Sequence, residues 1–152
     1  MRKLLVLPLL FFLIGAGCSK ASIDNAIKAT AAVAATNRAA SDLVDAELVA
    51  GRIDQPTRNA ATVIFKEVAR LDNSVLDILA PKNLNGNHVP VAFLSVAGRQ
   101  SIINSISQMR LRIAAGAFPF IKNEQSRADI SAQIKAISDG LEQILTLLPA
   151  AK

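Results

Sequence analysis

The chain of 152 residues contains no tryptophan and no tyrosine, and it has only one cysteine and one histidine. A single cysteine excludes an internal disulfide, because that bond joins two thiols. The single histidine, His88, excludes the paired Glu-x-x-His motifs that hold two metal ions in helical bundles. Glycine-rich phosphate-binding loops are absent as well. The sequence therefore predicts no metal, no cofactor and no enzymatic activity.

The composition favours helices over strands. Apolar residues make up 51% of the chain, but aromatic residues make up only 4%, and the apolar part is rich in alanine, isoleucine and leucine, a mixture typical of packed helices. The formal net charge is +5. Residues 18–80 carry a net charge of −1 and residues 81–152 a net charge of +4. This imbalance is too diffuse to predict nucleic-acid binding, which usually shows a clustered basic face.

The first seventeen residues have the pattern of a secretory signal peptide. Arg2 and Lys3 precede an apolar run from Leu4 to Ile14, and small residues follow it at 15–17. A helix that spans a bilayer needs about 20 apolar residues, and this run is only eleven residues long. We therefore expect a cleaved signal peptide at 1–17 and an exported single domain at 18–152.

Cys18 lies where a lipidated cysteine would be expected. The segment 14–19, Ile-Gly-Ala-Gly-Cys-Ser, resembles the lipobox of bacterial lipoproteins, in which the cysteine becomes the lipid-modified first residue. Ala16 and Gly17 match the two small residues of that motif, and Gly15 stands where leucine is usual. The resemblance implies attachment to a membrane through Cys18. Ser19, rather than aspartate, implies the outer membrane facing the periplasm, or the cell surface.

An ordinary signal peptide is the alternative interpretation of the same segment. A conventional signal peptidase could cut after Gly17 or Ala21, since it also selects small residues, and Cys18 would then have no special role. An exported protein with one unpaired thiol calls for an explanation, however. Lipidation supplies one, because the thioether consumes the thiol.

Hydrophobic periodicity predicts an all-α fold, an antiparallel four-helix bundle made of two helical hairpins. The helices are expected at about 22–49, 55–80, 91–117 and 124–148. The predicted apolar faces are Ile23, Ile27, Thr30, Ala34, Asn37, Ser41, Val44 and Leu48 in the first; Ala60, Val63, Ile64, Val68, Leu71, Val75, Ile78 and Leu79 in the second; Leu94, Ala97, Ile102, Ile106, Met109 and Ile113 in the third; and Ile130, Ile134, Ile137, Leu141, Ile144 and Leu148 in the fourth. The fourth face could also serve an intermolecular coiled coil.

Local signals predict the helix ends. Gly51 is placed for a left-handed cap after the first helix, and Asp54 is placed to cap the second. The loop from Pro81 to Pro90 carries the turn dipeptide Asn-Gly at 85–86. Ser126 has the spacing to Asp129 of a capping box at the start of the last helix.

Two sets of side chains are candidates for contact with a membrane or a partner. The basic residues Arg99, Arg110, Arg112, Lys122 and Arg127 could meet anionic lipid headgroups or an acidic protein, or could simply form a solvated face. Phe118 and Phe120, on either side of Pro119, could insert into a membrane or a partner's groove, or could close the end of the core. His88 is expected to be a polar surface residue.

The sequence thus predicts an exported, lipid-anchored bundle that acts as a non-catalytic binding or scaffolding component of the bacterial cell envelope. The alternative is a soluble periplasmic or secreted carrier that encloses an apolar ligand within the bundle. The alanine-rich stretch 29–40 could leave room for such a ligand, because alanine side chains are small.

Overall fold

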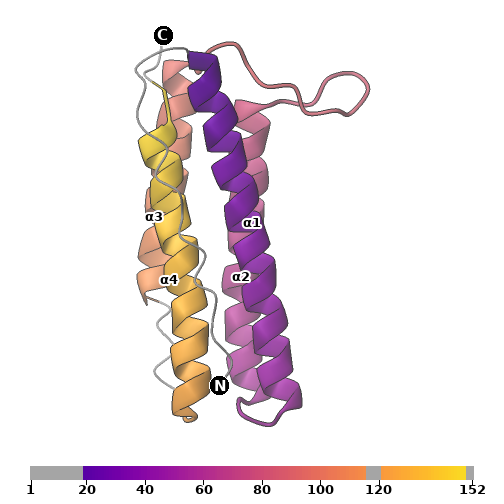
Figure 1. Cartoon of the computed structure of the whole chain (residues 1–152), viewed down its shortest axis with the longest axis vertical. Coiled ribbons are helices and arrows are strands. Elements are labelled where there is room, and N and C mark those ends of the chain that lie inside the picture. The colour runs from indigo at the N-terminus through magenta and orange to yellow at the C-terminus, as the bar shows by residue number, and fades with distance from the viewer. Residues whose placement is uncertain (1–18, 116–120, 150–152) are drawn as a thin grey trace, which may run out of the picture.

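The structure, a computed structural model, describes residues 19–115 and 121–149. These residues form four α-helices and no strand: α1 (Ser19–Val49), α2 (Gln55–Leu79), α3 (Val96–Ala115) and α4 (Glu124–Leu147). The helices run alternately up and down along one long axis (Figure 1). The predicted all-α four-helix bundle is therefore confirmed.

The helices form a ring in chain order. α1 packs against α2 and α4, and α3 packs against the same two helices from the opposite side. We call the end of the bundle where α1 and α3 begin and α2 and α4 end the upper end, and the other the lower end (Figure 1). Among the described residues, no helix is both long and apolar enough to cross a membrane.

The buried residues confirm the predicted apolar face of α4, but the buried faces of α1 and α2 differ from the predicted ones. In α4 all six predicted side chains are buried except Ile134, which is half-buried. In α1, Ala34 is exposed and Ser41 half-buried, because α1 contacts α2 on one side and α4 on the other and turns the stripe between them inward. The buried stripe of α1 is Ile23, Ala26, Ala29, Thr30, Val33, Asn37, Ala40, Val44 and Glu47. That of α2 is Thr57, Ala61, Phe65, Val68, Leu71, Asp72, Val75 and Leu79.

Some predicted core residues therefore lie at the surface. In α2, Ala60 is exposed and Val63 is 59% exposed, while Ile64 and Ile78 are half-buried. In α3, Ala97 is exposed. Gly140 of α4 lies close against α1, where an added Cβ would be 2.7 Å from Cγ2 of Val33. Glycine is thus what lets these two helices pack so closely.

The turn between α1 and α2 follows the sequence signals. Gly51 has a φ of 69° and donates its N–H to the carbonyl of Leu48, while the N–H of Arg52 reaches the carbonyl of Glu47. This is the Schellman pattern of a helix C-terminus. Asp54 caps α2 by accepting a hydrogen bond of 2.9 Å from the N–H of Thr57.

The starts of α1 and α3 differ from the prediction, since α1 begins at Ser19 rather than at 22, whereas α4 begins at Glu124 as predicted. α3 begins at Val96 rather than at 91, because Ser95 serves as its cap and accepts a 3.0 Å hydrogen bond from the N–H of Gly98. α4 is capped by Asn123, whose Oδ1 accepts from the N–H of Ser126. The predicted capping box from Ser126 to Asp129 is therefore wrong, since Ser126 lies inside the helix and uses its hydroxyl elsewhere.

Candidate functional site

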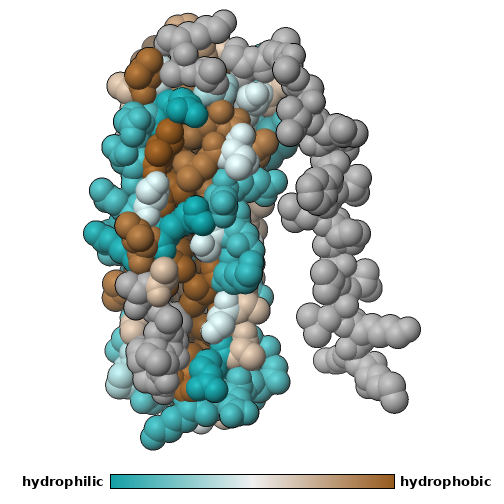
Figure 2. Space-filling view, turned by 90° about the vertical axis from the view of Figure 1, so that its left-hand side faces the viewer, coloured by the Kyte–Doolittle hydropathy of each residue, from teal (hydrophilic) through white to brown (hydrophobic). Residues whose placement is uncertain are grey.

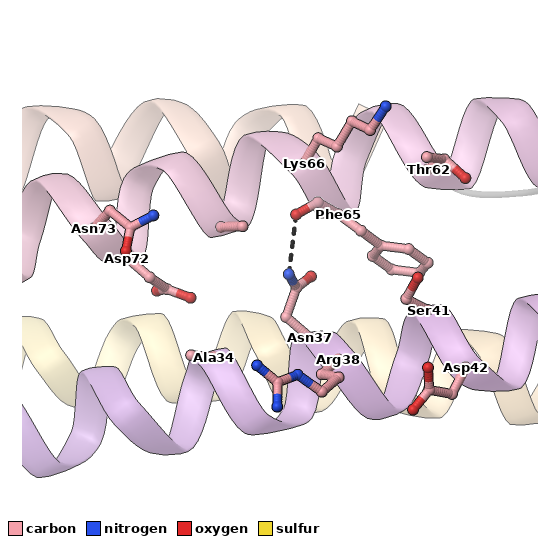
Figure 3. Close-up of a pocket in the computed structure, with 11 residues that line it drawn as sticks. Ala34, Asn37, Arg38, Ser41, Asp42, Thr62, Phe65, Lys66, Asp72 and Asn73 are labelled. Atoms are coloured by element: carbon pink, nitrogen blue, oxygen red, sulfur yellow. Dashed lines mark hydrogen bonds between the residues drawn. The ribbon is translucent and has the colours of Figure 1, made fainter.

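A cavity of about 440 Å³ lies between α1 and α2. Figure 3 shows polar side chains from both helices around it. Its lining residues are Ala34, Asn37, Arg38, Ser41 and Asp42 from α1, and Thr62, Phe65, Lys66, Ala69, Asp72 and Asn73 from α2. We call this space the α1–α2 cavity. Its size falls within the range of small-molecule sites, about 300–1,000 Å³.

Asn37 enters the cavity from α1 and is held in place by one hydrogen bond. Its Nδ2 donates to the backbone carbonyl of Phe65 at 2.9 Å, the dashed line in Figure 3. Its Oδ1 is buried and has no partner among the residues the structure describes. The donor side of this amide is therefore satisfied, and its acceptor oxygen is buried without a partner among these residues.

Asp72 is the second buried polar group of the cavity. The residue is only 5% exposed, and within the described part of the chain neither carboxylate oxygen has a hydrogen-bond partner. Burial raises the pKa of this carboxyl from 3.8 to about 7, because a charged carboxylate loses its hydration in a low-dielectric site.

Small side chains create the space around these two groups. Ala34 and Ala69 face the cavity from α1 and α2, where larger residues would fill it. The charged side chains of the lining other than Asp72 (Arg38, Asp42 and Lys66) belong to exposed residues. The α1–α2 cavity is therefore bordered by buried acceptors and by exposed charged residues of both signs.

Sequence reasoning placed Asn37 on the buried face of its helix but missed Asp72. The signal was present, because Asp72 lies four residues after Val68 and three before Val75, both buried. A charged residue at an apolar helix position is rare unless it is paired or functional. That spacing could have identified Asp72 as a candidate.

A second polar cluster joins three elements at the lower end. The carboxylate of Glu47, a residue only 4% exposed, receives hydrogen bonds from Arg52 Nε at 2.7 Å and Nη2 at 2.6 Å. The hydroxyl of Ser126, in α4, donates to the same carboxylate. Mainly through the hydrogen bonds from Arg52, this arrangement lowers the pKa of Glu47 from 4.5 to about 2. Arg52 and Ser126 both bind the Glu47 carboxylate, so we assign this cluster a structural role.

An apolar crevice lies between α3 and α4. It has a volume of about 280 Å³ and is lined by Arg110, Ile113, Ala114, Ser131, Ile134, Lys135 and Ser138. Figure 2 views the side of the bundle formed by these helices, where apolar side chains gather in a band between polar ones. Leu111, which is 71% exposed, also lies on α3. Apolar surface is therefore exposed on this side of the described bundle.

The loop between α2 and α3 projects from the upper end (Figure 1). Four of the seven large hydrophobic side chains that are exposed among the described residues belong to this loop or the first residue of α3: Leu84, Val89, Phe93 and Val96. Three side-chain contacts order the loop. Asn83 Oδ1 accepts from the N–H groups of Asn85 and Asn87, and His88 Nδ1 lies 2.5 Å from the carbonyl of Ala80. We call residues 81–95 the upper loop.

The structure does not bring the predicted basic residues together. Arg99 lies near the upper end, where its Nε donates to the carbonyl of Pro149 at 3.2 Å. Arg110 pairs with Glu142 at 2.9 Å, and Arg112 pairs with Glu67 in the middle of α2 at 2.8 Å. Lys122 and Arg127 are exposed near the lower end. The five side chains are thus spread along the bundle, and two of them are paired with carboxylates.

Three other predicted site residues, Cys18, Phe118 and Phe120, lie outside the described residues. Within the described ranges, no group of three or more histidine, cysteine, aspartate or glutamate side chains could hold a metal ion. Comparisons of the chain with protein-family models, with curated proteins and with solved structures returned no match.

Proposed function

We propose that this protein is a lipid-anchored, non-catalytic binding component of the bacterial cell envelope, attached through Cys18 with its upper end toward the membrane. One observation supports the orientation above all. α1 begins at Ser19, the residue directly after Cys18, and it begins at the upper end (Figure 1). A lipid on Cys18 would therefore have no flexible linker between it and the bundle.

The upper loop supports the same orientation. It exposes Leu84, Val89 and Phe93 at the end of the bundle from which the anchor would extend. Transfer of a large apolar side chain out of water stabilises by about 1.5–3 kcal/mol, so contact with the lipid interface would strengthen the attachment. The five predicted basic residues give less support to this orientation, because only Arg99 among them lies near the upper end.

A fluorescence experiment tests the anchor and the orientation together. The chain has no tryptophan, so Leu84→Trp introduces a single reporter in the upper loop. In the membrane-extracted protein reconstituted into phosphatidylcholine vesicles, we expect its emission to shift to the blue and to be quenched several-fold by brominated lipid. Cys18→Ser should abolish stable attachment to the vesicles.

Leu111→Trp is the matched control, because Leu111 is also exposed but lies on the side of the bundle, in α3. Its emission should stay that of a water-exposed tryptophan. Equal quenching of both reporters would mean that the bundle lies on its side. Quenching of neither, with the protein still attached, would refute the proposed orientation.

The second candidate function is a soluble carrier of an apolar ligand. The apolar crevice between α3 and α4 favours it, although its volume of about 280 Å³ lies just below the range of about 300–1,000 Å³ for ligand sites. In the alanine-rich part of α1, by contrast, only Ala34 borders a cavity, and that cavity is also lined by the buried polar residues Asn37 and Asp72. A carrier would remain in the soluble fraction and would retain an apolar molecule in native mass spectrometry.

A further inference from the structure

The α1–α2 cavity presents acceptors with no matching donors. Asn37 Oδ1 and both oxygens of Asp72 are buried without partners among the described residues. Burying a polar atom without a hydrogen bond is costly, so native structures rarely keep three such atoms along one cavity unless something else satisfies them. Because the donor side of Asn37 is fixed by the carbonyl of Phe65, the amide cannot turn to satisfy itself.

We propose that the α1–α2 cavity binds a small organic cation whose N–H groups donate to Asn37 Oδ1 and to the carboxylate of Asp72. This site lies on the side of the bundle and does not depend on the anchor at Cys18. A protein that is not lipidated would still carry it, so the two proposals can fail separately.

The chemistry of the lining selects this class of ligand. When Asp72 is charged, an anion would bring its own acceptors against Asp72 and Asn37, where no buried donor of the lining could meet them. A purely apolar molecule would leave all three oxygen atoms unsatisfied. A metal ion such as Ca²⁺ takes about 6–8 oxygen ligands, and the cavity offers one carboxylate and one amide oxygen inside. A protonated amine supplies both the charge and the donors.

The exposed groups that border the cavity carry charges of both signs. Asp42 adds a second carboxylate from α1, and Arg38 and Lys66 are exposed cations. These three and Asp72 are all the charged residues that line the cavity. The volume of about 440 Å³ suits an amine with a short aliphatic chain.

Titration with n-butylammonium chloride, followed by amide chemical shifts of the isotope-labelled full chain in detergent, tests the proposal. We expect saturable shifts confined to residues that line the cavity. Tetramethylammonium has the same charge without an N–H group, and n-butanol has the same chain without the charge. Both should bind at least tenfold more weakly than n-butylammonium.

Variants locate the binding. Asp72→Asn should weaken n-butylammonium at least tenfold, and Ala69→Leu, which fills the cavity but keeps the carboxylate, should weaken it to a similar extent. Asp77→Asn removes an exposed carboxylate from the same helix and should have no effect. Unchanged binding in Asp72→Asn, equal binding of tetramethylammonium, or no saturable binding at all would overturn the proposal.

A side chain of the protein could also turn in and take the ligand's place. Arg38 and Lys66 both border the cavity, and either one pairing with Asp72 would lower the pKa of its carboxyl. The ¹³C shift of the Asp72 carboxyl in the ligand-free protein should instead titrate well above the ordinary range of aspartate. Titration below that range would show that the chain itself satisfies Asp72, and the proposal would fall.

Discussion

Replacing Asp72 with asparagine should raise the free energy of unfolding at pH 8 by roughly 2–4 kcal/mol and should change it little at pH 4. The wild-type carboxylate is buried without a hydrogen-bond partner in the described part of the chain. Above neutral pH the folded protein must therefore hold a buried charge at this position, which lowers its stability relative to the unfolded chain. An amide of the same shape carries no such charge.

The direction of the pH dependence follows from the two pKa values. The pKa of Asp72 is about 7 in the folded protein, against 3.8 for an ordinary aspartate. Between these values the folded state keeps a proton that the unfolded state has released, so stability falls as the pH rises from about 4 to about 7. Above pH 7 both states have lost the proton and the dependence ends.

Urea denaturation followed by circular dichroism at unit steps from pH 4 to pH 8 measures this effect. The wild type should lose stability across the interval, and Asp72→Asn should show a much flatter profile. Asp139→Asn, which removes a 60%-exposed carboxylate of α4, should keep the wild-type slope. A wild-type profile that is flat, or that rises toward pH 8, would contradict the assignment of Asp72 as an unpaired buried acid.

Replacing Glu47 with alanine should lower the free energy of unfolding at pH 7 by about 2–3 kcal/mol. The carboxylate accepts two hydrogen bonds from Arg52 and one from Ser126, and so it ties the end of α1 to the start of α4. Breaking a fully buried ion pair costs about 3–5 kcal/mol. We expect less here, because the Arg52 side chain is 45% exposed.

Glu47 also gives the protein a separate sensitivity to acid. Its pKa is lowered from 4.5 to about 2, so its contribution is fully present above about pH 4.5 and is lost as the pH falls toward 2. Glu47→Gln should remove that part of the profile. Together with Asp72, this predicts that the wild type is most stable between about pH 4 and pH 5.

Asp45→Ala is the matched control for Glu47→Ala. Asp45 lies two residues earlier on α1 and pairs with Arg58 at 2.8 Å, but its side chain is 50% exposed. An exposed pair of this kind contributes about 0–1 kcal/mol, so the variant should be nearly as stable as the wild type. If thermal or urea unfolding shows equal losses for Asp45→Ala and Glu47→Ala, the lower cluster does not join the helices as described.

The contrast between the two acids bears on function. Glu47 is buried with partners and stabilises the fold, whereas Asp72 is buried without partners in the described residues and destabilises it at neutral pH. Proteins commonly give up stability at binding sites, where groups are held ready for a ligand. The predicted gain in stability of Asp72→Asn and its predicted loss of amine binding are therefore two consequences of the same unpaired carboxylate.

Helix content and caps could be predicted because they depend on short-range signals. Gly51 and Asp54 mark the turn between α1 and α2 through backbone geometry and a local hydrogen bond, and both were identified from spacing. Ser126 was misassigned, because its partner Glu47 lies 79 residues away in the chain. No local pattern carries that information.

The candidate site was harder to predict for a related reason. An alanine-rich helix has no strong apolar stripe, so the buried side of α1 was set by its contacts with α2 and α4. The cavity arises only where Ala34 and Ala69 from two helices come together. The basic residues of the second half were predicted to form one basic side of the domain. In the structure Arg110 and Arg112 instead pair with carboxylates on two different helices, α4 and α2.

The intact mass of the protein extracted from bacterial membranes tests the anchor most directly. Our account predicts a chain that begins at Cys18 and carries a diacylglyceryl group on the sulfur and an acyl chain on the amino group, since stable attachment requires more than one acyl chain. A chain that begins at Ser19 or Ser22, or one with a free thiol at Cys18, would contradict it.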